Sequence, residues 1–300
     1  MYPIIQVDSE ALIRDETLGT KTKYWFEYQE QYWLYKEARE NTGEDWAEKI
    51  AYEFAKLLRI NAATVELAEY QGKRGSVSLS FVNDRKGGVL IHGNEILAGQ
   101  VLGYDLKKKR LQSQHTLENI QTAVSKLFKN NNELENHILL KLASYLVLDA
   151  LIGNTDRHHE NWGLLLVPKF NEARQRTSFK LDVAPTFDHA SSLGRELTDE
   201  RRTIYMKQKL MQMYINKGVG AVYFAETDKK GANPLRLVEI ASNKMNDFFL
   251  PTLQILKSIK MEQLFEIIDQ IPNSRISDTS REFTKDFVAY THESLCKLVK

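Results

Sequence analysis

Residues 149–163 read DALIGNTDRHHENWG, and they directly follow a strongly apolar stretch that starts near residue 134. Within this segment Asp156 precedes Asn161 by five positions, and a second carboxylate, Asp188, follows a short apolar run further along the chain. This order of side chains is the one that a kinase-like site for phosphoryl transfer requires. In such a site the first Asp orients or deprotonates the attacking hydroxyl, while the Asn and the second Asp hold metal ions.

The residues around this loop predict a mainly helical second half of the chain. Its elements follow from apolar periodicity, a capping Thr and short β-type runs. They are expected as helices over residues 116–130 and 134–152, strands at residues 162–167 and 179–183, and two or three helices from residue 235 onward. Residues 279–282, TSRE, form a capping-box signature for the last helix.

The first 90 residues predict several strands around one helix. Aromatic-rich β-type runs occur at residues 24–26 and 32–35, and two more strand candidates cover residues 65–70 and 76–82. A helix is expected over residues 45–59, because apolar side chains recur there every third or fourth position after an acidic start.

These elements predict an α+β, two-lobed fold with a cleft between the lobes. We expect a small β-rich N-lobe over residues 1–90, with the phosphate loop, the sheet and one helix. A larger, mainly helical C-lobe over residues 91–300 would carry the catalytic loop and the metal site. A glycine-rich connection at residues 87–103 would link the two.

Composition narrows the class of protein further. The 300 residues are 42% hydrophobic and 27% charged, which suits a folded chain of one large domain or two lobes. The net charge of +1 provides no global field, so we expect no direct nucleic-acid partner and no membrane partner. A single cysteine, Cys296, excludes a disulfide framework, and the N-terminus has no signal-peptide pattern. A cytoplasmic location is therefore expected.

Phosphoryl transfer requires further parts in the N-lobe. A loop that covers the phosphates would lie at residues 17–23, TLGTKTK, just before the first aromatic strand. Lys36, at the end of the second aromatic run, is the candidate that pairs with the phosphates. The helix that follows should supply a carboxylate partner for this lysine, and either Glu48 or Glu53 fits by position.

Each of these residues also has an ordinary structural interpretation, as a turn or a solvated side chain, so their joint order carries the prediction. A metal-dependent phosphohydrolase competes, because His158 and His159 lie near other His and Asp residues. These are His137, Asp149, Asp188 and His189. Vicinal histidines in a loop point apart, however, and no H-x-x-x-H helix pairing occurs, which makes the phosphohydrolase weaker.

Two further classes of protein would have the same nucleotide site. A small-molecule or lipid kinase would use the same metal site, because this site serves any hydroxyl acceptor. A nucleotide-binding pseudokinase module without transfer activity is the rival outside the enzymes. The presence of Asp156, Asn161 and Asp188 together argues against the pseudokinase module.

The segment at residues 153–161, GNTDRHHEN, resembles the G-N-x-D-x-H-x-x-N motif of HipA-like Ser/Thr protein kinases. Residues 187–194, FDHASSLG, resemble the second metal-binding segment of that family. Residues 47–60 are similar to its N-E-x-x-x-x-x-L-A helix, with Ala47 in place of Asn. The match spans about residues 17–200. It implies a compact family member with a kinase-like fold related to phosphatidylinositol kinases, without the extra N-terminal subdomain of full-length toxin kinases.

The resemblance implies catalytic and metal-binding roles for particular residues. These are Asp156 as catalytic base, Asn161 and Asp188 as Mg²⁺ ligands, Lys36 as phosphate-pairing lysine, and Glu48 rather than Glu53 as its partner. It also implies a nucleotide-binding set, namely Gly19, Thr20, Lys36, His158 and the backbone of Leu79 and Phe81 at the inter-lobe hinge.

Further implications concern regulation, cofactors and partners. Family members autophosphorylate a serine of the phosphate loop, and this loop offers threonines instead, so Thr20 or Thr22 is the expected site. ATP and Mg²⁺ are the implied cofactors. The resemblance also implies a role as the toxin of a toxin–antitoxin pair, with an antitoxin protein as partner. The implied protein substrate is translation-related, such as a translation factor or an aminoacyl-tRNA synthetase.

Overall fold

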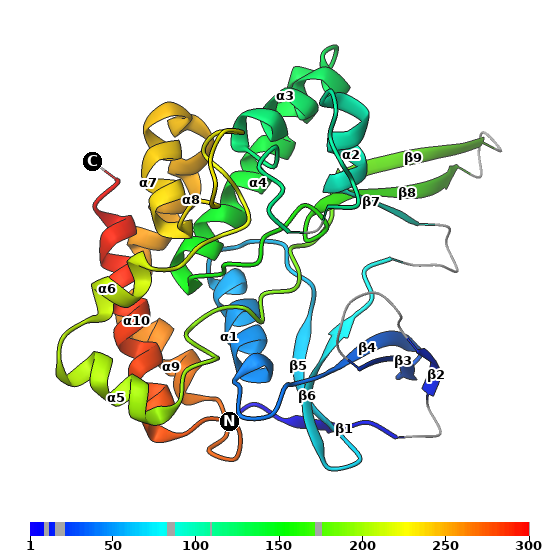
Figure 1. The fold of residues 1–300 in the computed structure, drawn as a ribbon. Coiled ribbons are helices and arrows are strands. Elements are labelled where there is room, and N and C mark those ends of the chain that lie inside the picture. Colours follow the sequence, from blue (N-terminus) through cyan, green and yellow to red (C-terminus); the bar gives the residue numbers. More distant parts are fainter. Residues whose placement is uncertain (9–11, 16–21, 83–87, 109, 172–175, 300) are drawn as a thin grey trace.

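A computed structural model describes most of the chain, and its elements form two lobes (Figure 1). A twisted sheet with one helix lies below, and a helical body with a small sheet lies above and beside it in this view. The described residues are 1–8, 12–15, 22–82, 88–108, 110–171 and 176–299. The α+β two-lobed fold predicted from the sequence is confirmed.

The N-lobe is built on a sheet that, in the described part of the chain, has six strands in the order β1-β5-β6-β4-β3-β2. Strand β1 pairs in parallel with β5, and the other neighbours are antiparallel. The strands are β1 (Ile4–Gln6), β2 (Leu12–Asp15), β3 (Lys23–Tyr28), β4 (Gln31–Glu37), β5 (Val65–Tyr70) and β6 (Lys73–Leu79). Strand β4 therefore lies inside the sheet and carries Lys36 near its end.

The aromatic runs form the β3–β4 hairpin, as predicted, but the expected strand at residues 76–82 instead covers Lys73–Leu79. Gly75 explains the earlier start, because it lies in β6 directly against β4. A side chain here would place its Cβ 2.3 Å from the Lys36 carbonyl oxygen and 2.7 Å from the Tyr35 ring. A glycine that reads as a turn residue is thus required by the close approach of two strands.

Helix α1 (Glu44–Leu57) packs against β5 and β6 and confirms the helix expected at residues 45–59. Its apolar face is buried at Trp46, Ile50 and Phe54. This face binds the helix to both lobes, because it belongs to the core cluster that also contains the C-lobe helices.

The first turn of α1 also makes charged contacts with the C-lobe. Buried Asp45 lies 3.4 Å from Arg275 Nη1 and accepts two hydrogen bonds from Arg74 Nη2. Glu44 pairs with Arg195, which directly follows residues 187–194 in sequence. The helix is therefore fixed at its N-terminal end by side chains from the larger lobe.

The C-lobe is a set of helices around α4, which contacts α3, α7, α8 and α10. The helices are α2 (Gly93–Gln100), α3 (Leu117–Phe128), α4 (Asn132–Ile152), α5 (Asp199–Lys207), α6 (Met211–Asn216), α7 (Pro234–Lys244), α8 (Asn246–Ser258), α9 (Met261–Asp269) and α10 (Asp278–Cys296). A sheet of three described strands, in the order β7-β8-β9, adjoins the cleft. They are β7 (Val89–His92), β8 (Gly163–Asn171) and β9 (Arg176–Val183). Among the described residues, no helix has the length and apolar character needed to cross a membrane.

The predicted helices at 116–130 and 134–152 are confirmed as α3 and α4, with Thr116 accepting a hydrogen bond as the cap of α3. The prediction of a glycine-rich connection at residues 87–103 is wrong, because this segment contains β7 and α2. Gly93 is the first residue of α2, and it has no room for a side chain because a Cβ there would lie 2.2 Å from the indole of Trp162. Four described helices follow residue 233, more than the two or three expected. The last is capped by Ser277, whose Oγ accepts from Ser280 N, and Thr279 lies inside its first turn.

Candidate active site

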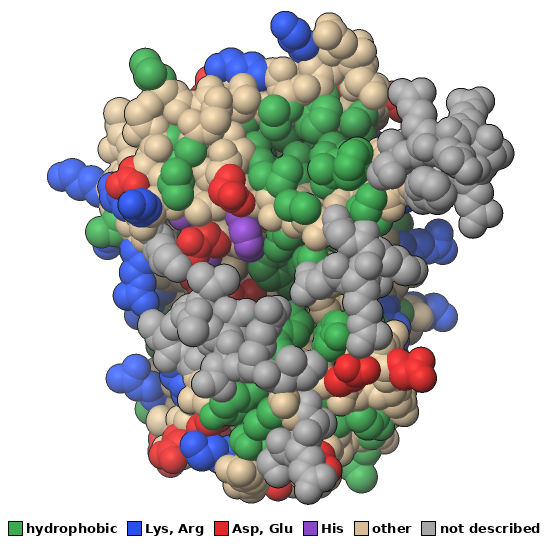
Figure 2. Space-filling view, turned by 90° about the vertical axis from the view of Figure 1, so that its right-hand side faces the viewer, with side chains coloured by type: hydrophobic (Ala, Val, Ile, Leu, Met, Phe, Trp, Pro, Cys, Tyr) green, Lys and Arg blue, Asp and Glu red, His purple; other side chains and the backbone are tan. Residues whose placement is uncertain are grey.

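A cleft of about 1690 Å³ is lined by both lobes. Figure 2 shows the side of the molecule that is on the right in Figure 1, where acidic side chains and a histidine gather beside a hydrophobic area. The cleft brings together most of the predicted site residues that the structure describes. These are Lys36, Leu79 and Phe81 from the N-lobe side, and Asp156, His158, Asn161 and Asp188 from the C-lobe side.

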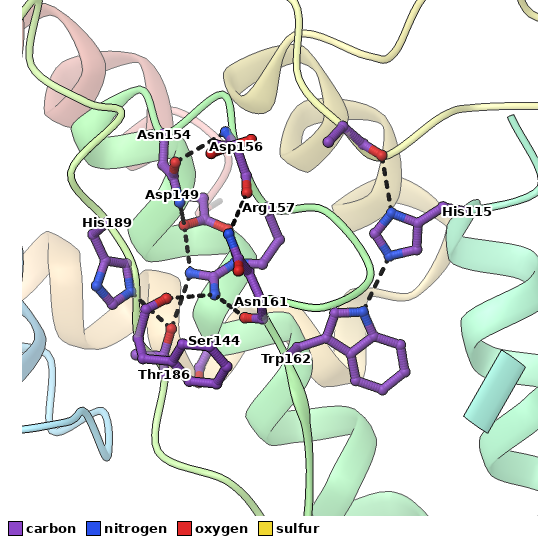
Figure 3. A network of polar contacts seen from close by, with 12 residues as sticks. His115, Ser144, Asp149, Asn154, Asp156, Arg157, Asn161, Trp162, Thr186 and His189 are labelled. Atoms are coloured by element: carbon purple, nitrogen blue, oxygen red, sulfur yellow. Dashed lines mark hydrogen bonds and ion pairs between the residues drawn. The ribbon is translucent and has the colours of Figure 1, made fainter. Parts of the chain in front are cut away.

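The loop after α4 presents Asp156 to the cleft. Asn154 shapes this loop, because its Nδ2 donates to Asp149 Oδ1 at 2.8 Å while its Oδ1 accepts from Asp156 N at 3.0 Å (Figure 3). Asn154 and Asp149 are buried, whereas Asp156 is exposed. A carboxylate on a turn that is fixed from below can therefore meet a group that enters from solvent.

Asn161 lies beneath Asp156 and is oriented by it. Its Nδ2 donates to the Asp156 carbonyl oxygen at 2.7 Å, and the side chain is only 4% exposed. Because the amide nitrogen has this fixed partner, the amide oxygen is the atom that remains to bind a cation.

Asp188 faces Lys36 across the cleft. Lys36 Nζ donates to Asp188 Oδ1 at 3.0 Å. Burial alone would lower the pKa of Lys36, but the negative charges of Asp188 and Glu48 raise it above its ordinary value. Asp188 has a φ of 61°, a left-handed conformation that Asp and Asn tolerate better than other non-glycine residues. The lysine is therefore charged, and it lies against the candidate metal ligand.

Glu48 lies behind this pair and is 1% exposed. Its Oε1 accepts from His189 N at 2.8 Å, whereas Oε2 is buried without a hydrogen-bond partner among the described residues. Burial would raise the pKa of Glu48, but the hydrogen bond from His189 and the charge of Lys36 hold it below its ordinary value. Glu53, the other candidate, instead bonds Lys49 and Lys56, each at 2.8 Å. Geometry thus places Glu48, and not Glu53, beside Lys36.

Sequence patterns gave no role to Arg157, whose buried side chain lies among Asp149, Asn161 and Thr186 (Figure 3). Its Nε and Nη2 donate to the two oxygens of Asp149 at 2.7 and 2.8 Å. Both side chains are almost fully buried. The signal in the sequence was Asp149 itself, because a carboxylate inside an apolar helix requires a buried partner.

The wall of the cleft beside Asn161 depends on a neutral histidine. His115 Nδ1 donates to the Ala221 carbonyl oxygen at 2.9 Å, and Nε2 accepts from Trp162 Nε1 at 3.1 Å. Since an indole N–H can only donate, Nε2 must be unprotonated. Burial lowers the pKa of His115 to about 3, in agreement with this arrangement.

The remaining predicted residues have mixed outcomes. Gly19 and Thr20 lie outside the described residues. Thr22 is exposed, and its carbonyl oxygen accepts from Glu37 N at 3.1 Å, beside the strand that carries Lys36. Leu79 ends β6, and Phe81 packs on Phe187 with a ring distance of 5.5 Å.

His158 keeps its side chain at the cleft, where Nδ1 accepts from Glu160 N at 3.2 Å. Asn161 and Asp188 offer the hard oxygen donors that Mg²⁺ prefers, so the donor set fits this ion. Among the described residues, no three His, Cys, Asp or Glu side chains are grouped to hold a metal. A cation bound by Asn161 and Asp188 would therefore take its other ligands from water and phosphate oxygens, as Mg²⁺ does in nucleotide sites. The phosphohydrolase hypothesis lacks its metal centre in the described part of the chain, and Asp149 is committed to Arg157.

The two-lobed fold and its charged cleft define a kinase-like protein. The sequence profile of the HipA-like C-terminal domain matches residues 16–249, and the chain belongs to this family. The fold is that of a kinase of HipA type. A sequence comparison with curated proteins finds no match.

Two solved structures share the fold. The proinflammatory kinase CtkA of Helicobacter pylori has 18% sequence identity and a TM-score of 0.75, over 99% of this chain and 98% of that one. HipA of a Shewanella oneidensis MR-1 toxin–antitoxin system, in complex with HipB and its operator DNA, has 14% identity and a TM-score of 0.55. The latter match covers 97% of this chain and 65% of HipA.

Proposed function

We propose that this protein is an ATP- and Mg²⁺-dependent kinase that transfers a phosphoryl group to a Ser or Thr hydroxyl of a protein. The observation that carries the proposal is the convergence of Lys36, Asp156, Asn161 and Asp188 on one inter-lobe cleft. Phosphoryl transfer depends on positioning and charge neutralisation, and these side chains supply both.

Lys36 is placed to exchange partners when a nucleotide binds. A Mg²⁺ ion held by Asn161 and Asp188 would neutralise charge on the phosphates. A cation bound to Asp188 Oδ1 would compete with the hydrogen bond from Lys36. Lys36 would then bond the phosphates and Glu48. The buried Oε2 of Glu48, which has no hydrogen-bond partner among the described residues, supports this second position for the lysine.

Asp156 is the candidate base. Its exposed carboxylate would orient the acceptor hydroxyl and take its proton as the new phosphoester bond forms and the bond from the γ-phosphorus to the leaving ADP breaks. The cleft of about 1690 Å³ has room for a nucleotide beside an acceptor group. The protein acceptor is proposed from the family to which the chain belongs.

Three finer proposals follow from the family. Thr20 or Thr22 is the autophosphorylation site, and Thr22 is supported by its exposure beside the strand of Lys36. The HipA neighbour was solved with HipB and operator DNA, which supports an antitoxin partner for a toxin role of this chain. A translation-related substrate in the cytoplasm completes the proposal.

The test is incubation of the purified chain with radiolabelled ATP and Mg²⁺. We expect Asp156→Asn to reduce labelling by roughly 10²–10⁴-fold while ATP binding by calorimetry persists. Asp188→Asn should lose labelling as well. Asp182→Asn is the matched control, because Asp182 pairs with Lys141 and does not line the cleft.

Equal labelling of all four chains would contradict the assigned site. ATP binding without labelling of the unmodified chain, with or without added protein acceptors, would favour the pseudokinase module. Phosphopeptides confined to the C-lobe would remove Thr20 and Thr22 as autophosphorylation sites.

A further inference from the structure

Arg157 connects three segments that meet beneath the cleft. We propose that Arg157 is a positioning residue that sets the spacing between the two metal-binding segments, those of Asn161 and Asp188. The inference rests on the proposed function and adds to it a determinant of metal–nucleotide binding that does not itself touch the ligand.

One side of the guanidinium group is anchored to helix α4. Nε donates to Asp149 Oδ2 at 2.7 Å, and Nη2 donates to Oδ1 at 2.8 Å. Arg157 is 4% exposed and Asp149 2% exposed, so this ion pair is shielded from water. Asp149 therefore provides a rigid reference point near the end of the helix from which the catalytic loop leaves.

The other side of the group reaches both metal-binding segments. Nη1 donates to the Asn161 carbonyl oxygen at 2.6 Å and to the Phe187 carbonyl oxygen at 3.3 Å. Nη2 also donates to Thr186 Oγ1 at 2.9 Å. One planar group thus contacts one candidate ligand residue and the two residues that precede the other.

The contacts continue to the lysine's candidate partner. Thr186 Oγ1 lies 2.8 Å from His189 Nε2, and His189 N donates to Glu48. A displacement of Arg157 would therefore move the backbone on both sides of Asp188.

Only arginine can make this set of contacts. Its five N–H groups lie in one plane in a fixed geometry, and the five bonds described above use every one of them. A lysine offers three donors from a single point, so it can keep the charge opposite Asp149 but not the whole set of contacts.

Arg157→Lys is accordingly the first variant. We expect its affinity for the non-hydrolysable ATP analogue AMP-PNP with Mg²⁺ to fall by roughly 10–100-fold, the range typical of lost outer-shell contacts to metal sites. Its affinity for AMP-PNP in EDTA should equal that of the unmodified chain. Isothermal titration calorimetry measures both, and the ratio of the two dissociation constants is the readout.

Arg281→Lys is the matched control. Arg281 is also buried, at 8% exposure, and donates to the carbonyl oxygens of Ile268 and Ile271, away from the cleft. It reports the general cost of replacing a buried guanidinium group, and its ratio should equal that of the unmodified chain.

Thr186→Val keeps the buried ion pair of Arg157 with Asp149 and removes the two contacts of Thr186 Oγ1, those to Arg157 Nη2 and to His189 Nε2. Its ratio of the two dissociation constants should shift in the same direction by a smaller factor. If Arg157→Lys does not fold, Thr186→Val tests the inference. A normal ratio in Thr186→Val and in any folded Arg157→Lys, or the same shift in Arg281→Lys, would overturn the inference.

Failure of the proposed function would look different. In that case the unmodified chain would bind AMP-PNP no better with Mg²⁺ than in EDTA, and Asp188→Asn would change nothing. The positioning role would then fall together with the proposed function.

Discussion

Two ion pairs lie close together in this protein and differ in the solvent exposure of their side chains. Lys36 and Asp188, at the cleft, make one contact of 3.0 Å with side chains that are 13% and 32% exposed. Arg157 and Asp149, beneath the cleft, make two bonds with side chains that are 5% and 2% exposed. The first pair can exchange its partners for a ligand, whereas the second cannot do so without unfolding its surroundings.

The difference in exposure distinguishes groups that would bind ligands from groups that hold the backbone in place. Charged groups that must bind phosphates and cations need access to the cleft, and their mutual contact is weakened by solvent. Groups that hold the backbone gain strength from a dry environment, but the loss of one member leaves a buried charge. Variants in the two regions should therefore affect stability and activity in opposite proportions.

The largest effect on stability is expected for Asp149→Ala. This change leaves the Arg157 cation buried without its carboxylate, which should lower the free energy of unfolding by about 3–5 kcal/mol. Urea denaturation followed by circular dichroism measures the loss. Asp269→Ala serves as control, because Asp269 is 48% exposed and its pairs with Arg281 and Lys285 should contribute under about 1 kcal/mol. Similar losses in both variants would erase the distinction between the two regions.

A smaller decrease in the free energy of unfolding is expected at low pH, because His115 is buried in its neutral form. The pKa of His115 is about 3 in the folded chain, below its ordinary value of 6.5, so the unfolded chain binds more protons between these values. Stability should therefore fall as pH decreases below 6.5, by at most about 1.4 kcal/mol per pH unit. The His115→Asn variant should lack this component of the slope. Urea denaturation at several pH values above the carboxylate range tests it, and parallel slopes in both chains would refute the assignment.

The smallest change in stability is expected for Asp188→Asn. The pair at the cleft is partly solvated, and Asn tolerates the left-handed backbone of this position, so the free energy of unfolding should change by less than about 1 kcal/mol. Labelling with ATP should nevertheless be lost. A loss of stability as large as that of Asp149→Ala would show that Asp188 supports the fold as well.

Much of the fold could be predicted because strong local signals agreed with the tertiary structure. The apolar face of α1, the aromatic hairpin β3–β4 and the long apolar α4 were all readable from periodicity. Errors occurred where a residue served a distant neighbour. Gly93 reads as part of a loop, yet it is the first residue of a helix and is a glycine because Trp162 occupies the space of a side chain.

The candidate site divides in the same way. Asp156, Asn161 and Asp188 follow from spacing in the sequence, because the chemistry of phosphoryl transfer constrains which residue types occur there. Contacts between segments could not be read from spacing. The bonds of Arg157 to Thr186 and Phe187 join residues that are far apart in sequence. Likewise, the choice of Glu48 over Glu53 rests on contacts between segments, because Glu48 acts on Lys36 whereas Glu53 pairs with Lys49 and Lys56.

The contacts at the first turn of α1 have a mechanical consequence. Asp45 and Glu44 are paired with Arg275 and Arg195 of the larger lobe, and Glu48 further along bonds His189. An outward swing of this helix would have to break all three contacts. The buried carboxylates of Asp45 and Glu44 would each lose the arginine of the larger lobe and keep only the one from the N-lobe, Arg74 and Arg39 respectively. We therefore expect control of this protein to act on access to the cleft rather than by displacement of α1.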